Sequence, residues 1–321
     1  MEIVCATDSK YIMPTGIMLI SLLENNMGET IHIHLLHDDT ASSFLEPIKE
    51  VVANYRQNIS FYLVNNDTFS SFPIGKDYQL DHVGTSLATY YRLYLAEILP
   101  DTIDKIIYLD GDILVVHRLT QLWNTDLTGY AVGAVPDSYN NMVEHYNRLR
   151  YPQAKGYFNA GVLLVNLKYW RKNNVTALFL DYVKHYPDRL KCHDQDVLNF
   201  VFMDRKLILP LKYNILNEYW FDVRYNFVSW EYEEQLLEAQ THPIIVHFTC
   251  IPKPWYRNCL HPCKEIFEKY KSMSPWRNTK ERRWGTWKFW LEKTAIRLVV
   301  MLGLREENYI VENRYIKLSN R

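Results

Sequence analysis

The chain has 321 residues and is 48% hydrophobic, enough to bury the core of one large domain or of one domain with an appendage. Its formal net charge of −1 argues against a nucleic-acid partner. The five cysteines are odd in number and form no CxxC pair, which fits a reducing compartment better than a disulfide framework. The N-terminus lacks a basic and apolar leader, and no apolar run is long enough to span a bilayer. We therefore expect a cytoplasmic protein.

Strands and helices are predicted to alternate along the first 270 residues. The predicted strands cover residues 2–6, 30–37, 59–64, 106–109, 130–135, 161–167 and 243–248, and the predicted helices cover residues 14–26, 42–55, 86–99 and 194–203. This alternation indicates an α/β fold with a mostly parallel sheet flanked by helices. Such sheets bind ligands at the carboxyl ends of their strands, and Asp8 and Asp110 each follow a predicted strand. We therefore expect both residues at the ligand-binding edge.

The stretch KIIYLDGDILVV, residues 105–116, places two carboxylates directly after an apolar strand. In an extended chain, residues two apart face the same way, so Asp110 and Asp112 would converge, with Gly111 giving backbone room. Two convergent carboxylates repel each other, and a hard divalent cation such as Mg²⁺ or Mn²⁺ removes that repulsion. A simple turn is the alternative, because Asp and Gly favour turns. The buried strand before the pair favours a metal site.

Two enzyme classes place Asp-x-Asp after a hydrophobic strand: phosphatases of the haloacid-dehalogenase type and nucleotide-sugar glycosyltransferases. In the phosphatases the motif usually opens the domain and continues with Thr or Val, where this chain has Leu114. Here roughly a hundred residues of alternating strands and helices come first. The position of the motif therefore favours the glycosyltransferases.

Several separated motifs make residues 1–265 resemble glycosyltransferase family 8, the retaining family that includes bacterial lipopolysaccharide galactosyl- and glucosyltransferases and glycogenin. The motifs are IVCATDSKY, TSLATYYRLYL, YLDGDILV, YFNAGVLLVNLKYWR, HDQDVLN and HFTCIPKPW. The resemblance implies a Rossmann-like GT-A fold, a UDP-galactose or UDP-glucose donor and Mn²⁺ or Mg²⁺ as cofactor. It also implies a surface glycan or a lipid-linked molecule as acceptor.

The resemblance assigns roles to the residues of these motifs. The implied metal ligands are Asp110, Asp112 and His247. The implied nucleotide-binding residues are Ala6, Thr7, Asp8, Asp110, Gly111, His247 and Lys253. The implied donor-sugar residues are Arg92, Asp137, Asn159, Ala160, Asp194 and Gln195, of which Gln195 and Asp194 would lie at the reaction centre. A non-catalytic sugar-nucleotide or glycan-binding protein is the alternative outside the enzymes, and the intact set Asp110, Asp112, His247 and Lys253 argues against it.

Several of these residues would have simpler interpretations in isolation. His247 lies on an apolar strand, where a histidine is more often part of the core than a ligand. The cluster from Asp194 to Asp196 would ordinarily be a helix N-terminal cap. Two residues depart from the family pattern, because Lys10 replaces an Asn and Cys250 stands where related enzymes often have Gly. Neither departure affects the predicted metal ligands.

Residues 271–321 form a predicted C-terminal tail that differs in composition from the domain at 1–270. The tail holds twelve Lys or Arg against five Glu, and four of the nine tryptophans. A helical spacing puts one set of apolar residues on one face, with cations around it: Trp284, Trp287, Trp290, Leu291 and Leu298, with Arg282, Arg283, Lys288 and Lys293. This combination is typical of a helix that lies on an anionic membrane surface. We expect peripheral attachment to the inner face of the membrane, and the alternative is a helix packed on the core.

Overall fold

A computed structural model describes residues 1–38, 42–73, 86–220 and 232–285, together with residues 291, 294, 295, 298 and 302. Its centre is a seven-stranded sheet in the order β3-β2-β1-β4-β7-β6-β8. The strands are β1 Glu2–Thr7, β2 His32–His37, β3 Asn58–Leu63, β4 Lys105–Leu109, β6 Val132–Pro136, β7 Phe158–Asn166 and β8 Lys206–Ile208. Every pairing in this sheet is parallel except those of β7, which runs antiparallel to β4 and to β6. The predicted mostly parallel sheet is confirmed.

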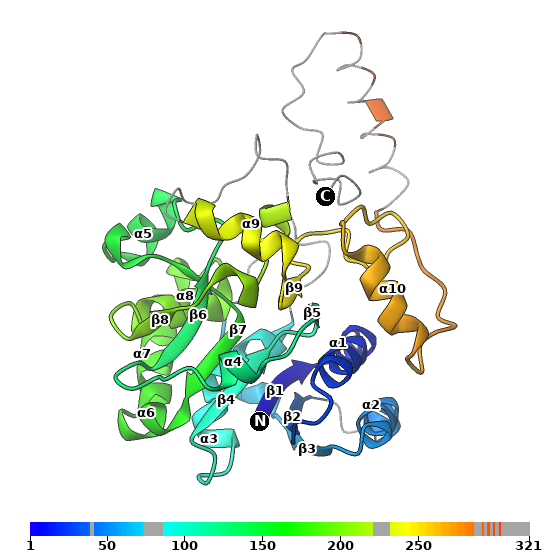
Figure 1. The fold of residues 1–321 in the computed structure, drawn as a ribbon. Coiled ribbons are helices and arrows are strands. Elements are labelled where there is room, and N and C mark those ends of the chain that lie inside the picture. The colour runs from blue at the N-terminus through cyan, green and yellow to red at the C-terminus, as the bar shows by residue number, and fades with distance from the viewer. Residues whose placement is uncertain are drawn as a thin grey trace.

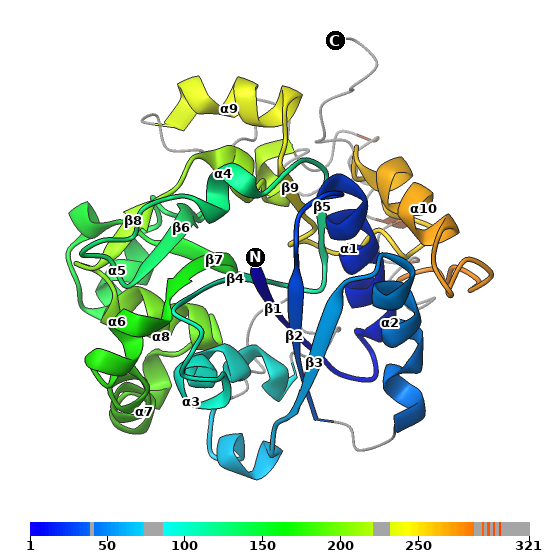
Figure 2. The same cartoon turned by 60° about the horizontal axis from the view of Figure 1, so that its bottom comes forward.

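Helices cover both faces of this sheet (Figures 1 and 2). The helices are α1 Ile12–Asn25, α2 Ser42–Asn54, α3 Leu95–Ile98, α4 Thr120–Trp123, α5 Val143–Leu149, α6 Leu167–Lys172, α7 Val175–His185, α8 His193–Val201, α9 Glu233–Thr241 and α10 Lys264–Ser272. Buried side chains of α1, α2 and α10 pack in one apolar cluster with Ile3 of β1, and those of α7 and α8 pack in a second cluster with Val4. Successive residues of a strand face opposite sides, so β1 contributes to both.

The segment predicted as a single helix at residues 86–99 has a different form. Residues Leu87–Tyr94 form a 3-10 helix, and α3 follows directly from it. A 3-10 helix aligns residues three apart, so Thr89 and Arg92 point to the same side. Both side chains contact Asp194 of α8, so this face of the 3-10 helix packs against the start of α8.

A separate two-stranded ribbon completes the carboxyl edge of the sheet. Its strands are β5 Ile113–Val115 and β9 Ile245–His247, which run antiparallel. In this register Ile113 pairs with His247, directly beside Asp112. The late strand at residues 243–248 was predicted without a pairing partner. The ribbon brings its histidine next to the Asp-Gly-Asp segment.

The first part of the predicted tail packs on the domain. Helix α10 continues across residue 270, and the Trp276 ring lies so close to Gly16 of α1 that a Cβ there would be 2.1 Å from it. Further along, Arg282 forms a β-bridge with Tyr256, and the backbone N–H of Trp284 donates to Asn258 Oδ1 at 2.8 Å. These contacts place residues 271–285 with the domain, so a boundary at 270 would cut through a packed segment.

Most of the predicted membrane helix falls outside the described residues, including Trp287, Lys288, Trp290 and Lys293. Leu291 and Leu298 are described and are exposed, as is Leu302. Among the described residues, no helix is both long enough and apolar enough to cross a membrane.

Candidate active site

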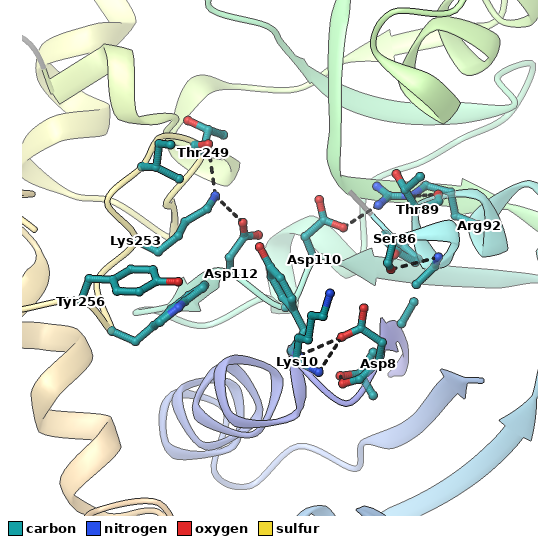
Figure 3. Close-up of a pocket in the computed structure, with 18 of the residues that line it drawn as sticks. Asp8, Lys10, Ser86, Thr89, Arg92, Asp110, Asp112, Thr249, Lys253 and Tyr256 are labelled. Carbon is teal, nitrogen blue, oxygen red and sulfur yellow. Dashed lines mark hydrogen bonds and ion pairs between the residues drawn. The ribbon is translucent and has the colours of Figure 1, made fainter. Parts of the chain in front are cut away.

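A cavity of about 640 Å³ opens at the carboxyl ends of β1 and β4, a size suited to a small-molecule ligand. Figure 3 shows its carboxylates and cations pointing toward one another. Eight of the predicted site residues line the cavity: Ala6, Thr7, Asp8, Arg92, Asp110, Gly111, Asp112 and Lys253. The other six do not, although hydrogen bonds and ion pairs tie each of them to the same site: Asp137, Asn159, Ala160, Asp194, Gln195 and His247.

Asp110, Asp112 and His247 form the predicted three-residue cluster. The Nε2 atom of His247 lies 3.3 Å from Asp112 Oδ1 and 4.0 Å from Asp110 Oδ2. One ligand atom from each residue lies within 4.8 Å of the others. The backbone fixes this arrangement, because the Asp110 N–H donates to the Gly161 carbonyl at 2.8 Å and β9 pairs with β5. Two carboxylates and one imidazole are a donor set that suits a divalent cation.

Two glycines make room for this cluster. A Cβ on Gly161 of β7 would lie 2.2 Å from His247 Cε1 and 2.8 Å from Asp110 Oδ2, so only glycine fits there. A Cβ on Gly111 would lie 2.5 Å from the Oγ1 atom of Thr15, which is buried in α1. Sequence patterns predicted the need for space at Gly111 but gave no signal for Gly161, since its neighbours come from distant segments.

A chain of buried amides fixes the tautomer of His247. Asn159 Oδ1 accepts the backbone N–H of Gly161, so the Nδ2 of Asn159 must be the atom that faces Asp137 Oδ2, at 3.1 Å. Asn214 Nδ2 donates to the same Asn159 Oδ1 at 2.9 Å, which leaves Asn214 Oδ1 facing His247 Nδ1 at 3.0 Å. His247 therefore carries its proton on Nδ1. The Nε2 atom faces the two carboxylates and is the nitrogen that a metal ion would bind.

Arg92 and Lys253 balance the charge of the two carboxylates. The Arg92 guanidinium lies 2.6 Å from Asp110 Oδ1 and over the Tyr108 ring, and Lys253 Nζ lies 2.8 Å from Asp112 Oδ2. Burial would raise the pKa of Asp112, but Lys253 and His247 hold it below its ordinary value. Burial raises the pKa of Asp110 despite the neighbouring Arg92. The two acids of one motif are thus electrostatically unequal.

A second network joins the residues predicted to bind the donor sugar. Gln195 Nε2 donates to Asp137 Oδ2 at 3.2 Å, and Gln195 Oε1 accepts the Ala160 N–H at 2.9 Å. Asp137 therefore accepts hydrogen bonds from both Gln195 and Asn159. Through Asn159 it links this network to the amide chain that ends at His247. Asp194 forms an ion pair with Arg92 at 3.0 Å and accepts a hydrogen bond from Thr89.

Several residues at the site received no role in ligand binding from the sequence. Asn214 and Thr89 reach it only through tertiary contacts, and Tyr11, Trp255 and Arg282 line the cavity. Arg282 had been predicted to be one of the cations around a membrane helix, but the bridge to Tyr256 holds it at the cavity instead.

The two departures from the family pattern also have places in the structure. Lys10 lines the cavity, and its backbone N–H donates to Asp8 Oδ1 at 2.8 Å. The Cys250 thiol donates to Glu218 Oε1 at 3.0 Å, and Cys250 is absent from the lining residues, unlike its neighbours Thr249 and Ile251. The larger side chain at position 250 is therefore accommodated away from the cavity.

The model of the family described as glycosyl transferase family 8 matches residues 2–259 of this chain. The chain belongs to this family. The match includes the strand ends, the Asp-Gly-Asp segment and the loop that carries His247 and Lys253. Membership decides against a phosphatase of the dehalogenase type, the alternative that the motif alone had left open.

Curated relatives resemble the chain over most of its length. General stress protein A of Bacillus subtilis is 26% identical over 280 residues, which cover 86% of this chain and 94% of that protein. A lipopolysaccharide 1,2-glucosyltransferase of Escherichia coli is 27% identical, with 84% and 78% covered. The lipopolysaccharide 1,3-galactosyltransferase of Salmonella typhimurium is 24% identical, with 84% and 77% covered.

The fold is similar to that of a solved glycosyltransferase. The galactosyltransferase LgtC, in complex with donor and acceptor sugar analogues, has a TM-score of 0.74 and 28% identity, and the match covers 86% of this chain and 96% of that one. LgtC has also been solved as an active-site mutant in which glutamate replaces glutamine. The predicted GT-A fold is confirmed by this likeness.

Proposed function

We propose that this family 8 glycosyltransferase moves glucose or galactose from a UDP-sugar to a surface glycan or a lipid-linked acceptor, using Mn²⁺ or Mg²⁺ and retaining the anomeric configuration. The observation that carries the proposal is the cluster of Asp110, Asp112 and His247 at the sheet edge that also holds Asp8. The names of the Escherichia coli and Salmonella relatives support a lipopolysaccharide-type acceptor and these two sugars.

The end of β1 is assigned to the nucleotide. Ala6, Thr7 and Asp8 line one side of the cavity, and Asp8 Oδ1 accepts the backbone N–H groups of Lys10 and Tyr11 at 2.8 and 2.9 Å. These bonds hold the loop between β1 and α1 in shape. The Oδ2 atom of Asp8 is then the atom that we assign to the ribose hydroxyls, because a carboxylate oxygen accepts hydrogen bonds from them.

The cation side of the cavity is assigned to the leaving diphosphate. A divalent cation on Asp110, Asp112 and His247 would supply Lewis-acid stabilisation of the charge that develops on the leaving phosphate. Lys253 adds a fixed positive charge, because its Nζ is held by Asp112 and by the carbonyls of Phe248 and Thr249. Its pKa is raised by Asp112 against the effect of burial, so the amine stays protonated.

The network around Asp137 is assigned to the donor sugar, together with Arg92, Asn159 and Ala160. Gln195 Oε1 accepts one hydrogen bond, from Ala160, and so keeps a lone pair for the positive charge that develops at the anomeric carbon. Asp194 is held by Arg92 and Thr89, which suits a positioning and electrostatic role. Gln195 is therefore our choice for the residue nearest the reaction, and the LgtC mutant supports a glutamine at such a site.

A screen of UDP-sugars tests the function. Purified protein with Mn²⁺ should release UDP slowly from UDP-glucose or UDP-galactose, and excess chelator should stop the release. Absence of release from every UDP-hexose, together with tight Mn²⁺-dependent binding of UDP, would instead identify a non-catalytic sugar-nucleotide binding protein. Absence of both would remove the donor assignment.

The tail is assigned to an anionic membrane surface, with a domain boundary beyond residue 285. Leu291, Leu298 and Leu302 are exposed and spaced by seven and four, as on one helical face. Full-length protein should bind vesicles that contain phosphatidylglycerol, and the binding should fall steeply with salt. A chain that ends at residue 285 should release UDP normally and ignore the vesicles. Equal vesicle binding by both chains would contradict the assignment.

A further inference from the structure

A second group of potential metal ligands lies at the end of the sheet opposite the cavity. Glu2 begins β1, His32 begins β2, and His34 follows two residues later on the same face. The two strands are parallel, with Glu2 paired to His32 at one end and Thr7 paired to His37 at the other. Since the cavity lies at the Thr7 end, the group belongs to a separate site (Figure 2).

The three side chains converge on one point. Glu2 Oε2 lies 2.7 Å from His34 Nε2 and 3.4 Å from His32 Nδ1, and the two imidazole rings are 4.2 Å apart. One ligand atom from each residue lies within 4.8 Å of the others. Ligands of a tetrahedral ion with bonds of about 2.0–2.1 Å lie slightly more than 3 Å apart, and the two distances from Glu2 Oε2 fall on either side of that value.

The other nitrogen of each histidine already has a partner on the neighbouring strand. His32 Nε2 lies 2.8 Å from Ser60 Oγ, and His34 Nδ1 lies 3.0 Å from the Tyr62 hydroxyl, both on β3. Histidines that bind metals almost always donate their second N–H to an oxygen, which fixes the ring and the tautomer. Ser60 and Tyr62 can accept those protons, leaving Nδ1 of His32 and Nε2 of His34 free for an ion.

Exposure also suits an ion. The His34 side chain is fully buried, so its ring is held in place against the neighbouring strands. The Glu2 and His32 side chains are 32% and 35% exposed, which gives an ion and a water molecule access from solvent. A third cluster, formed by His145, Cys192 and Asp196, is less suited to a metal ion. The Asp196 carboxylate already accepts hydrogen bonds from two side chains and two backbone N–H groups.

We propose that Glu2, His32 and His34 form a second divalent-metal site, selective for a borderline cation such as Zn²⁺ and with its fourth position open to water. Two imidazoles and one carboxylate favour Zn²⁺, whereas the oxygen-rich set of the cavity suits Mg²⁺ or Mn²⁺. The ion would join the first two strands at their amino ends and stabilise them against separation. This site stands whether or not the proposed function does, because no residue is shared.

Zinc binding to the full-length protein tests the proposal. A chromophoric chelator competes for Zn²⁺, and the number of tightly bound ions is compared between wild type and the variants His32→Ala and Ser60→Ala. His32→Ala should lose one equivalent, and Ser60→Ala should weaken that equivalent by on the order of tenfold. His117→Ala is the matched control, since this exposed histidine belongs to none of the candidate metal clusters and should leave both the stoichiometry and the affinity unchanged.

Crystals soaked in Zn²⁺ give the second measurement. An anomalous difference peak between Glu2 and the two histidines is expected, independent of any peak beside Asp112. Equal zinc stoichiometry in wild type and His32→Ala, or an anomalous peak only beside Asp112, would overturn the proposal. The cluster would then only link neighbouring strands through hydrogen bonds. If His32→Ala fails to fold, the Ser60→Ala affinity and the crystal peak decide the matter.

Discussion

The chain contains the pattern Asp-x-Asp twice, at Asp110–Asp112 and at Asp194–Asp196, and the two pairs have different surroundings. The first pair follows β4, and both of its carboxylates face the cavity. The second pair lies in the first turn of α8, where residues two apart are rotated by about 200° around the axis. Asp194 therefore contacts Arg92, whereas Asp196 faces Arg148 and Tyr157.

The partners of the two pairs differ as well. Asp196 is completely buried, and its oxygens accept hydrogen bonds from Arg148, the Tyr157 hydroxyl and the backbone N–H groups of Lys191 and Cys192. Asp112 has a lysine and a histidine as partners at the edge of a cavity. A carboxylate that is saturated by fixed donors serves the fold, and one that faces a cavity beside a histidine nitrogen can bind an ion.

The largest expected effect comes from removing a charge of the first pair. Asp112→Asn should lower the metal-dependent release of UDP from its donor sugar by at least about a hundredfold, since Lewis-acid stabilisation is worth several kcal/mol. Calorimetric titration of UDP with Mn²⁺ checks the cause, because the binding should lose its metal dependence. Asp110→Asn provides a second variant, and a normal rate in both would show that the pair holds no catalytic ion.

The matching change in the second pair should act on stability. Asp196→Asn leaves the Arg148 charge without its partner in a mostly buried position, at a cost of about 3 kcal/mol in the free energy of unfolding. Urea unfolding measures this loss, and the folded fraction should keep its Mn²⁺-dependent affinity for UDP. A variant that is as stable as wild type but cannot bind UDP would reverse the assignment of the two pairs.

Gln195, which lies between Asp194 and Asp196, should affect the reaction itself. Gln195→Ala removes the oxygen that we place near the anomeric carbon, so kcat should fall by roughly ten- to a hundredfold while the KM for the donor changes little. Steady-state kinetics with the active UDP-sugar separates the two quantities, and Gln121→Ala on the exposed surface is the control. A rise in KM at constant kcat would make Gln195 a residue of donor binding alone.

The smallest effect is expected at Asn214, which orients the His247 ring but does not line the cavity. Asn214→Ala removes the acceptor for His247 Nδ1, so Mn²⁺-dependent UDP binding should weaken by on the order of tenfold. UDP binding measured in chelator should stay the same, which separates an effect on the metal from a general loss of structure. If UDP binding weakened equally with and without Mn²⁺, Asn214 would act on the fold in general and would have no specific effect on His247 as a metal ligand.

The local pattern of the sequence predicted most strands of the sheet, the helices α1, α2 and α8, and the position of Asp110 and Asp112 at the end of β4. Hydrophobic periodicity and turn residues act over a few residues, so these features can be predicted from short windows. Family resemblance supplied His247, Gln195 and the remaining site residues, which no periodicity distinguishes from core or capping residues. The 3-10 form of residues 87–94 could not be predicted in this way, because it depends on contacts with Asp194 more than a hundred positions along the chain.

Only the tertiary structure shows how His247 comes to lie beside the first Asp-x-Asp pair at a cavity. The pairing of β5 with β9 puts His247 beside Asp112, the absence of a side chain at Gly161 makes space for it, and Asn214 fixes its proton. The segment after residue 270 likewise brings Arg282 to the cavity. Each of these contacts joins segments that are far apart in sequence. Their geometry follows from which strands pair and how the loops pack, and a short stretch of sequence does not show which distant segment it will meet.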